Sequence, residues 1–296
     1  MRKIKPNPLM TGARIAELIL PTAAGFVLLS VILVIFIDLR NVLGLGDILN
    51  RHFFWHWYRN GGPVEMLQWL LLAASALTSL FVVGRLSTRD RSACAFWLLM
   101  GIAFTLMLIE DAGDPRHRIR EYVQFAFAEH EGQGVMGTLW ELLYFVGLAA
   151  FPLYALLRHG RALRGMGRTR SYVLAGFVAY GIAASFSFVG SAFSALMDRN
   201  VYQITGDALV RLGLRIGDSE LPRYWTADGY VDFHLMDGMV EESIELIGAA
   251  AFFSAAVSFL SVGLEKDPAA PTGRSQAQHP ERETGLSAPP PRSPVA

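Results

Sequence analysis

The chain has little cysteine, little lysine and little charge. Its 296 residues include one cysteine, Cys94, and three lysines, and only 18% of the residues are charged. A single cysteine forms no intrachain disulfide and, by itself, no thiolate metal site. Soluble domains carry about 25% charged residues, so the composition excludes an ordinary soluble enzyme. Basic and acidic residues number 26 each, which excludes the positive charge excess of a nucleic-acid-binding protein.

Apolar sequence, in contrast, is abundant. Hydrophobic residues make up 52% of the chain, and the mean hydropathy is +0.34. A membrane-spanning helix needs about 20 mostly apolar residues, and the chain contains six such runs. The predicted fold is an all-α, polytopic six-helix transmembrane bundle over residues 1–264. Its spans are predicted at about residues 15–37, 64–83, 93–109, 134–157, 172–197 and 239–262.

The C-terminal segment, residues 265–296, has a different composition. It holds 7 of the chain's 14 prolines and few residues that would form a core. Segments of this composition do not bury enough apolar surface to fold. We therefore predict a disordered, Pro-rich cytoplasmic tail.

The distribution of arginine predicts the orientation of the bundle. Lys and Arg favour the cytoplasmic side of a membrane protein. The short segments before the first span, after the second and after the fourth are rich in arginine and nearly free of acids, which places both the N- and C-termini in the cytoplasm. The scarcity of lysine among the basic residues is typical of a GC-rich bacterial genome. We therefore predict a multi-pass protein of the bacterial inner (plasma) membrane, with the lipid bilayer as its environment; a membrane partner protein stays open.

The segments between the spans also carry signals. The aromatic run His52–Tyr58 predicts side chains at headgroup depth, and the His52/His56 pair is interpreted as part of that belt. Residues 118–128 predict a short helix along the membrane, and residues 200–237 a segment that folds over the bundle. Small residues on the fifth span predict close helix packing: Gly181 with Ser185, and Gly190 with Ser194.

Acidic residues gather near the predicted outer ends of four spans. Placing a charge at the bilayer centre costs about 2.5–3.5 kcal/mol on insertion scales, so such residues normally face a cavity, a partner or a ligand. Glu141 lies about 10 Å into the fourth span, at a helical rise of about 1.5 Å per residue. Four spans that carry acids at one depth predict a shared polar site in the outer leaflet. The acids of the other three spans are Glu65, Glu110, Asp111, Asp114, Asp237, Glu241, Glu242 and Glu245.

Two local patterns support this site. His234, Asp237, Glu241 and Glu245 follow one another at +3, +4 and +4, which keeps them on one face of an α-helix. Because like charges at this spacing repel, the stripe requires protons, a cation or arginines as compensation. After the third span, Gly113 and Pro115 predict a sharp turn that folds Asp114 and His117 back over the helix end.

Three interpretations of the site stay open. The first is a divalent metal of unassigned identity, held as in the di-iron and di-manganese bundles, although neither histidine follows a glutamate at i+3 within a span. The second is that the acids pair with Arg116, Arg118 and Arg120. The third is a set of protonatable carboxylates on an ion pathway. The predicted pool of metal ligands is Glu110, Asp114, His117, Glu141, His234, Asp237, Glu241 and Glu245.

These interpretations lead to three candidate functions. The first is a metal-dependent membrane enzyme that acts on a lipid or small amphiphile, with its catalytic residues unassigned. The alternatives are a cation- or proton-coupled transporter that uses the same carboxylates, and a structural or accessory membrane subunit. A closed inner half of the bundle favours the enzyme, whereas a polar path through it favours transport.

Overall fold

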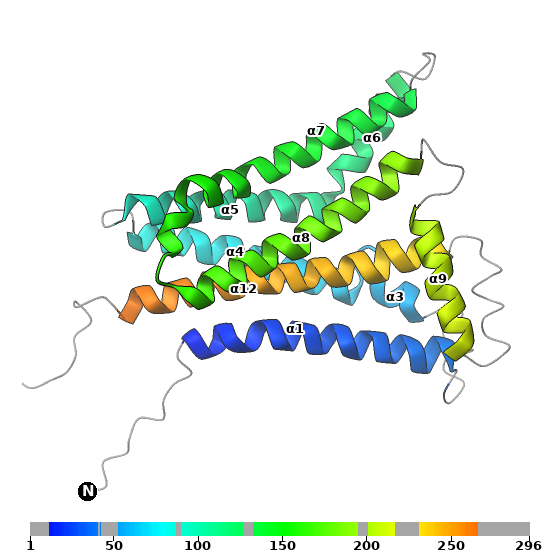
Figure 1. Cartoon of the computed structure of the whole chain (residues 1–296), viewed down its shortest axis with the longest axis horizontal. Helices are drawn as coiled ribbons and strands as arrows, with labels where there is room; N and C mark the ends of the chain where they lie inside the picture. Colours follow the sequence, from blue (N-terminus) through cyan, green and yellow to red (C-terminus); the bar gives the residue numbers. More distant parts are fainter. Residues whose placement is uncertain are drawn as a thin grey trace, which may run out of the picture.

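The computed structural model describes residues 12–40, 42, 53–86, 90–126, 133–194, 201–216 and 231–265. These residues form a bundle of helices (Figure 1), and no strand occurs in them. Six helices within these ranges are long and apolar enough to cross a membrane. The prediction of an all-α bundle with six apolar spans is therefore confirmed. The predicted tail, residues 265–296, lies outside the described residues except for Glu265.

The helices begin and end close to the predicted spans. In the described ranges, the π-helical segments η1, η3 and η5 and the 3₁₀ turn η4 continue or precede the α-helices. In chain order the elements are α1 (Gly12–Val34), η1 (Ile35–Leu39), α3 (Phe53–Tyr58), α4 (Pro63–Leu86), α5 (Arg91–Gly113), α6 (Pro115–Ala126), α7 (Gln133–Tyr154), η3 (Ala155–His159), η4 (Gly160–Leu163), α8 (Gly167–Ser194), α9 (Val201–Ile216), α11 (Val231–His234), η5 (Leu235–Glu241) and α12 (Glu242–Glu265).

Helix α12 is the central helix of the bundle. It packs against α1, α4 and α8, while α5 packs against α4 and α7 (Figure 1). Its apolar stretch is the most deeply buried of the six. The helices run side by side, and we call the end where α4 begins, α5 ends and α12 begins the acidic end. Helix α1 begins and α12 ends at the opposite end (Figure 1).

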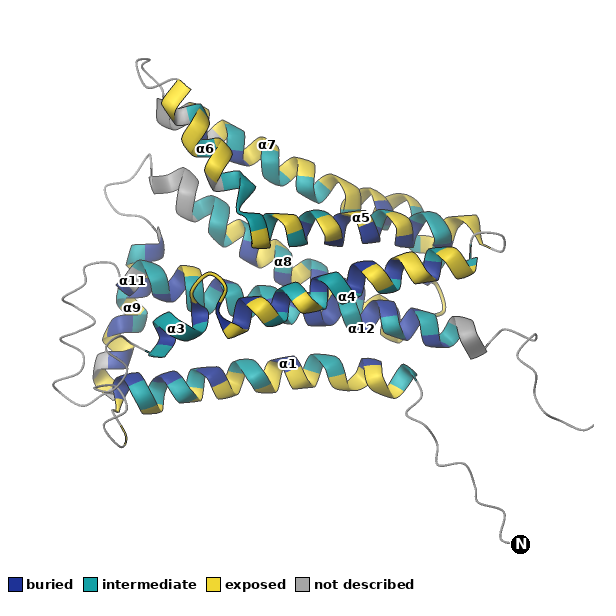
Figure 2. Cartoon of the chain, turned by 180° about the vertical axis from the view of Figure 1, so that it is seen from behind, coloured by how far each residue is buried: buried dark blue, intermediate teal, exposed yellow. Residues whose placement is uncertain are grey.

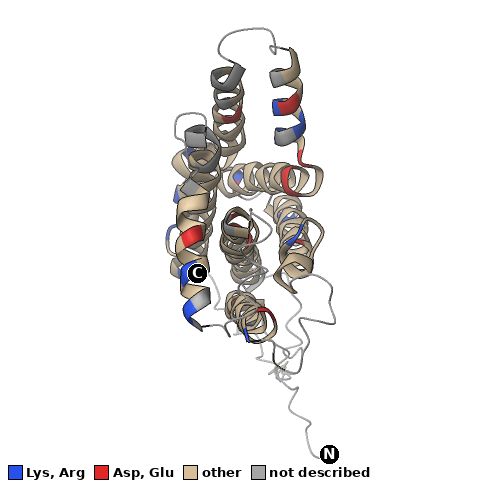
Figure 3. Cartoon of the chain, turned by 90° about the vertical axis from the view of Figure 1, so that its right-hand side faces the viewer, with Lys and Arg blue, Asp and Glu red and all other residues tan. Residues whose placement is uncertain are grey.

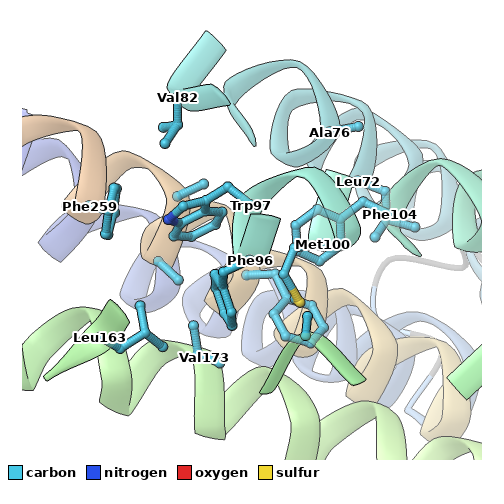
Figure 4. Close-up of a cluster of buried hydrophobic side chains, with 14 of the residues drawn as sticks. Leu72, Ala76, Val82, Phe96, Trp97, Met100, Phe104, Leu163, Val173 and Phe259 are labelled. Carbon is cyan, nitrogen blue, oxygen red and sulfur yellow. The ribbon is translucent and has the colours of Figure 1, made fainter. Parts of the chain in front are cut away.

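A dense hydrophobic core fills the half of the bundle away from the acidic end. Phe96, Trp97 and Met100 of α5 are completely buried, and they pack with residues of α4, α8 and α12 (Figure 4). The ring centroids of Trp97 and Phe259 lie 5.1 Å apart. Among the described residues, the core therefore joins α4, α5, α8 and α12.

Close packing of α8 on α12 depends on two glycines that the sequence did not indicate. A Cβ atom at Gly176 would lie 2.5 Å from the Phe252 ring, and one at Gly248 would lie 2.6 Å from the Tyr180 ring. At Gly181, by contrast, a Cβ would meet nothing within 4 Å. The prediction of close packing at Gly181 is therefore wrong. The surroundings of Gly190 and Ser194 lie outside what the structure describes.

The aromatic run folds into the bundle. The carboxylate of Asp38, at the end of the first span, accepts hydrogen bonds from the backbone N–H groups of Phe53 (2.6 Å) and Phe54 (2.8 Å). These bonds satisfy amides at the start of α3, as an N-cap residue does. The side chains of Phe54 and Tyr58 are buried. The sequence placed the whole run at headgroup depth, whereas the cap supplied by Asp38 draws these two rings inside; His52 lies outside the described residues.

Two further helices lie at the acidic end, α6 beside α7 and α9 across the end of the bundle (Figure 1). Helix α6 confirms the predicted short helix near residues 118–128, and it begins three residues earlier, at Pro115. Its Tyr122 and Phe125 are 73% and 80% exposed. Helix α9 lies across the end of the bundle against α11 and η5 (Figure 1). In the part that the structure describes, residues 200–237 therefore fold over the bundle as predicted.

Candidate functional site

A cavity of about 530 Å³ lies at the acidic end, between α4, α5, α7, α8 and α12. This volume is within the range of small-molecule sites, about 300–1,000 Å³. One wall is polar and carries eight carboxylates and one basic residue, Arg116. The other wall is apolar and comes mainly from α7 and α8. The lining acids are Glu65, Glu110, Asp111, Asp114, Asp237, Glu241, Glu242 and Glu245.

Gln68 of α4 holds the centre of the polar wall. Its side-chain Nε2 donates one hydrogen bond to Asp111 Oδ2 (2.7 Å) and one to Glu245 Oε2 (2.8 Å). Gln68 is completely buried. Within the described part of the chain, neither Asp111 nor Glu245 forms an ion pair, so a neutral amide is what joins these two carboxylates. Buried charges are normally paired or bind a ligand.

Three buried polar atoms at or beside this centre have no hydrogen-bond partner among the described residues. They are Oε1 of Gln68, Oε2 of Glu242 and the hydroxyl of Tyr180, and the last two residues line the cavity. A buried polar atom without a partner costs about 1–3 kcal/mol. The site therefore has two spare acceptors and one spare hydroxyl.

Arg116, at the start of α6, is held against the rim of the cavity. Its Nε lies 3.2 Å from Glu110 Oε1, and its Nη1 donates to Ser187 Oγ at 2.7 Å. The guanidinium also stacks 4.9 Å from the centre of the Phe145 ring. Glu110 accepts a further hydrogen bond from the Tyr144 hydroxyl at 2.5 Å. Arg116 and Tyr144 thus neutralise and orient Glu110, at one edge of the polar wall.

Helix α9 supplies a hydrogen bond to another acid of the wall. The hydroxyl of Tyr202 donates to Glu241 Oε2, and both residues are buried. Burial raises the pKa of Tyr202 above its usual value, and the adjacent negative charge of Glu241 raises it further. The phenol therefore keeps its proton and continues to act as the donor to Glu241.

The turn after α5 places Asp114 on the cavity wall. Asp114 adopts a left-handed conformation (φ 49°) and its N–H bonds to the Glu110 carbonyl at 2.8 Å, which ends the helix. The sequence predicted this turn and attributed the sharp change of direction to Gly113. In the structure it is Asp114 that has the positive φ. Aspartate tolerates this region better than most residues. The side chain of His117 lies outside what the structure describes.

The predicted stripe on the sixth span is interrupted. Residues Leu235–Glu241 form a π-helical segment, in which the i→i+5 hydrogen bonds change the phase of the side chains. Asp237, Glu241 and Glu245 still reach the cavity. His234 does not; its ring packs edge-on against Trp55, with centroids 4.6 Å apart. The α-helical spacing assumed from the sequence does not hold across η5.

Glu141 lies apart from this group. It is buried, but it pairs with Arg120 Nη1 at 2.7 Å and does not line the cavity. Pairing with arginine, the second interpretation of the acids, is therefore correct for Glu141 and Glu110. Asp111 and Glu245 form no such pair among the described residues.

The metal interpretation stays a prediction. Among the residues that the structure describes, no three His, Cys, Asp or Glu side chains form a group that could hold a metal ion. Gln68, Tyr144, Tyr180 and Tyr202 are site residues that the sequence reasoning missed. Gln68 could have been found from the sequence, because it is a polar amide inside an apolar span, one helical turn after Glu65.

Known proteins add no assignment. The chain matches no protein-family model, no curated protein and no solved structure. The function is therefore argued from the site itself.

Proposed function

We propose that this chain is a membrane protein that binds a cation in the acidic cavity and exchanges it for protons, as a cation- or proton-coupled transporter does. The observation that carries the proposal is the centre of the polar wall, where Asp111 and Glu245 share one neutral amide and form no ion pair among the described residues. Two carboxylates this close favour a cation or a proton between them. Acids within membrane spans commonly mark ion and substrate pathways.

The irregular helices around the cavity also support this proposal. The π-helical segment η5 leads directly into α12, and Pro152 of the cavity wall precedes the π-helical segment η3. Interruptions of this kind are frequent at functional sites. Irregular or proline-containing backbone therefore lies beside the cavity in both α7 and the segment leading into α12.

The test uses the purified protein in liposomes that contain a trapped pH-sensitive dye. Addition of tetramethylammonium outside is expected to raise the internal pH as protons leave in exchange. Asp111→Asn and Glu245→Gln remove a charge at nearly constant volume and should reduce the initial rate at least tenfold. Glu17→Gln, at the opposite end of the bundle, should leave it unchanged. A wild-type protein that neither binds tetramethylammonium nor moves protons would contradict the proposal.

The metal-dependent membrane enzyme is the second candidate, and one observation favours it: Phe104 and Phe252 line the cavity and also belong to the packed hydrophobic core. Asp111 and Glu245 provide hard oxygen ligands of the kind that Mg²⁺ and Ca²⁺ prefer, and Mg²⁺ is often held by only one or two carboxylates with water. Such an ion would act as a Lewis acid. Metal analysis of the purified protein tests this candidate, because stoichiometric metal that Glu245→Gln removes would support it over transport.

A further inference from the structure

We propose that the cavity is open to the lipid bilayer between α7 and α8 and that its ligand is a cationic amphiphile, with its charged head at the acidic wall and its chain between these two helices. The inference rests on the proposed cation binding and specifies the class of cation and its route of entry.

The first observation is the separation of the two walls. The carboxylates come from α4, the end of α5 with the turn after it, and the segment from η5 into α12, whereas α7 and α8 contribute mainly apolar residues and no carboxylate. On α7 the apolar wall extends from Phe145 to Leu153, a rise of about 12 Å along the helix. A hydrated inorganic ion gains nothing from such a surface. A ligand with one charged group and an alkyl chain contacts both walls.

The second observation is the exposure of the apolar wall. Val146 and Leu153 of α7 line the cavity and are nevertheless 58% and 46% exposed. Gly181 of α8 lines it as well, is exposed, and has open space where a side chain would stand. Figure 2 shows that α7 is mostly exposed or half-buried along its length. These residues lie within the apolar spans, so the surface that they reach faces lipid.

The third observation is a separate polar exit. Asn60 and Asp237 line the cavity and are exposed at the acidic end. A small water-soluble cation therefore reaches the carboxylates without passing α7 and α8. The polar exit and the lipid-facing opening lie at different parts of the cavity, which matches the orientation of an amphiphile at a membrane surface, with its head near water and its chain in the hydrocarbon.

Charge complementarity selects the head group. Arg116, the one basic residue among the lining residues described, already pairs with Glu110. The centre at Asp111 and Glu245 therefore has no fixed positive partner to attract an anionic head. A quaternary or primary ammonium group would lie on the cavity side of the two carboxylates that Gln68 joins. Tyr180, on α8, lines the same cavity. An anionic lipid head would meet repulsion from the same groups.

The experiment separates the head site from the opening. Protein in lipid nanodiscs is titrated with radiolabelled tetramethylammonium and, separately, with dodecyltrimethylammonium, and empty nanodiscs give the background. The variant Gly181→Phe fills the opening from a position with free space. We expect it to weaken dodecyltrimethylammonium binding at least tenfold while tetramethylammonium binding stays unchanged. Gly147→Phe is the matched control, because Gly147 is also an exposed glycine with nothing within 4 Å but does not line the cavity.

The outcomes distinguish the two proposals. Asp111→Asn should abolish binding of both cations. If the wild-type protein binds neither cation, the proposed function fails. If tetramethylammonium binding depends on Asp111 but dodecyltrimethylammonium binds no more tightly, or Gly181→Phe leaves its binding intact, the cation site stands and the lateral opening is refuted. Dodecyl sulfate binding as tightly would also refute it. Val146→Trp repeats the test from α7, should Gly181→Phe fail to fold.

Discussion

Gln68 determines how the acids of the polar wall are arranged. Its amide group has two N–H donors, and both are used by carboxylates that come from different helices, Asp111 on α5 and Glu245 on α12. Hydrogen bonds to charged groups contribute about 1.5–3 kcal/mol each. One buried side chain therefore joins α4, α5 and α12 at the point where their negative charges would otherwise repel.

The first prediction concerns this residue. Gln68→Leu keeps the volume but removes both donors, and should lower the free energy of unfolding in detergent by about 3 kcal/mol or more. Adding Asp111→Asn to this variant should restore part of the loss, because the new amide removes one charge and donates to Glu245. Thermal unfolding followed by circular dichroism measures both variants. A double variant no more stable than Gln68→Leu would show that charge repulsion is not the cause.

A second prediction concerns Tyr202, whose pKa is raised in the folded protein by burial and by Glu241. Tyr202→Phe should lower stability by about 1.5–3 kcal/mol at pH 7, since a hydrogen bond to a carboxylate is lost. A raised folded-state pKa stabilises the protein below the pKa of the unfolded chain, about 10. The contribution of the raised Tyr202 pKa should therefore be lost above pH 10, where the difference between wild type and variant should decrease. Denaturant titrations at several pH values test this; a difference that grows above pH 10 would contradict it.

Sequence reasoning at the residue scale located the acids and named two of their arginine partners, Arg116 and Arg120, but it missed Gln68 and the tyrosines. An acid in an apolar run stands out because a buried charge is costly, so Glu110, Glu241 and Glu245 could be found directly. The tyrosines could not, because a tyrosine in a membrane helix is equally typical of interfacial packing. Glu141 satisfied the same rule as the other acids, and only the course of α6 shows that Arg120 reaches it.

At the scale of the helices, the length of the apolar runs predicted the spans. The assumption of a constant α-helical periodicity did not predict which side chains share a face on the sixth span. Six runs became six helices because a spanning segment must satisfy its backbone hydrogen bonds internally. The phase of the side chains was lost where α11, η5 and α12 meet, since a π-helical segment rotates the helical turns on either side of it relative to each other. His234 therefore packs on Trp55, whereas Glu241 and Glu245 reach the cavity. No residue type marks this segment in the sequence.

The packing of α8 on α12 gives an element-scale prediction. Gly176→Ala places a methyl group against the buried ring of Phe252, and we expect it to destabilise the protein by about 1–3 kcal/mol, the usual cost of overpacking. Gly181→Ala, on the same helix, has free space and should be neutral or stabilising by up to about 1 kcal/mol, since alanine favours the helix. Thermal unfolding of the two variants side by side tests the difference. Equal stability would show that the Gly176 contact is not tightly packed.

At the scale of the whole molecule, charge is distributed unequally between the two ends. Viewed along the bundle, most residues of the helices are neither acidic nor basic (Figure 3). The opposite end carries many arginines and few acids. One of these acids, Glu17, pairs with Arg168. Arginines flanking short segments favour the cytoplasm, which would place the acidic end and its cavity outside. The arginines of the opposite end are Arg14, Arg85, Arg91, Arg158, Arg161, Arg164, Arg168 and Arg170.

The last prediction tests this orientation with single cysteines. The chain has only one cysteine, Cys94, so Cys94→Ser gives a background without thiols. Thr205→Cys lies on the exposed face of α9 at the acidic end, and Arg161→Cys is exposed at the opposite end. A membrane-impermeant maleimide added to intact cells should label the cysteine at 205, because no apolar layer separates it from the outer solution. It should label the cysteine at 161 only after permeabilisation. The reverse pattern would turn the cavity toward the cytoplasm. The proposed cationic amphiphile would then enter from the inner leaflet, and its proposed head site at Asp111 and Glu245 would be unchanged.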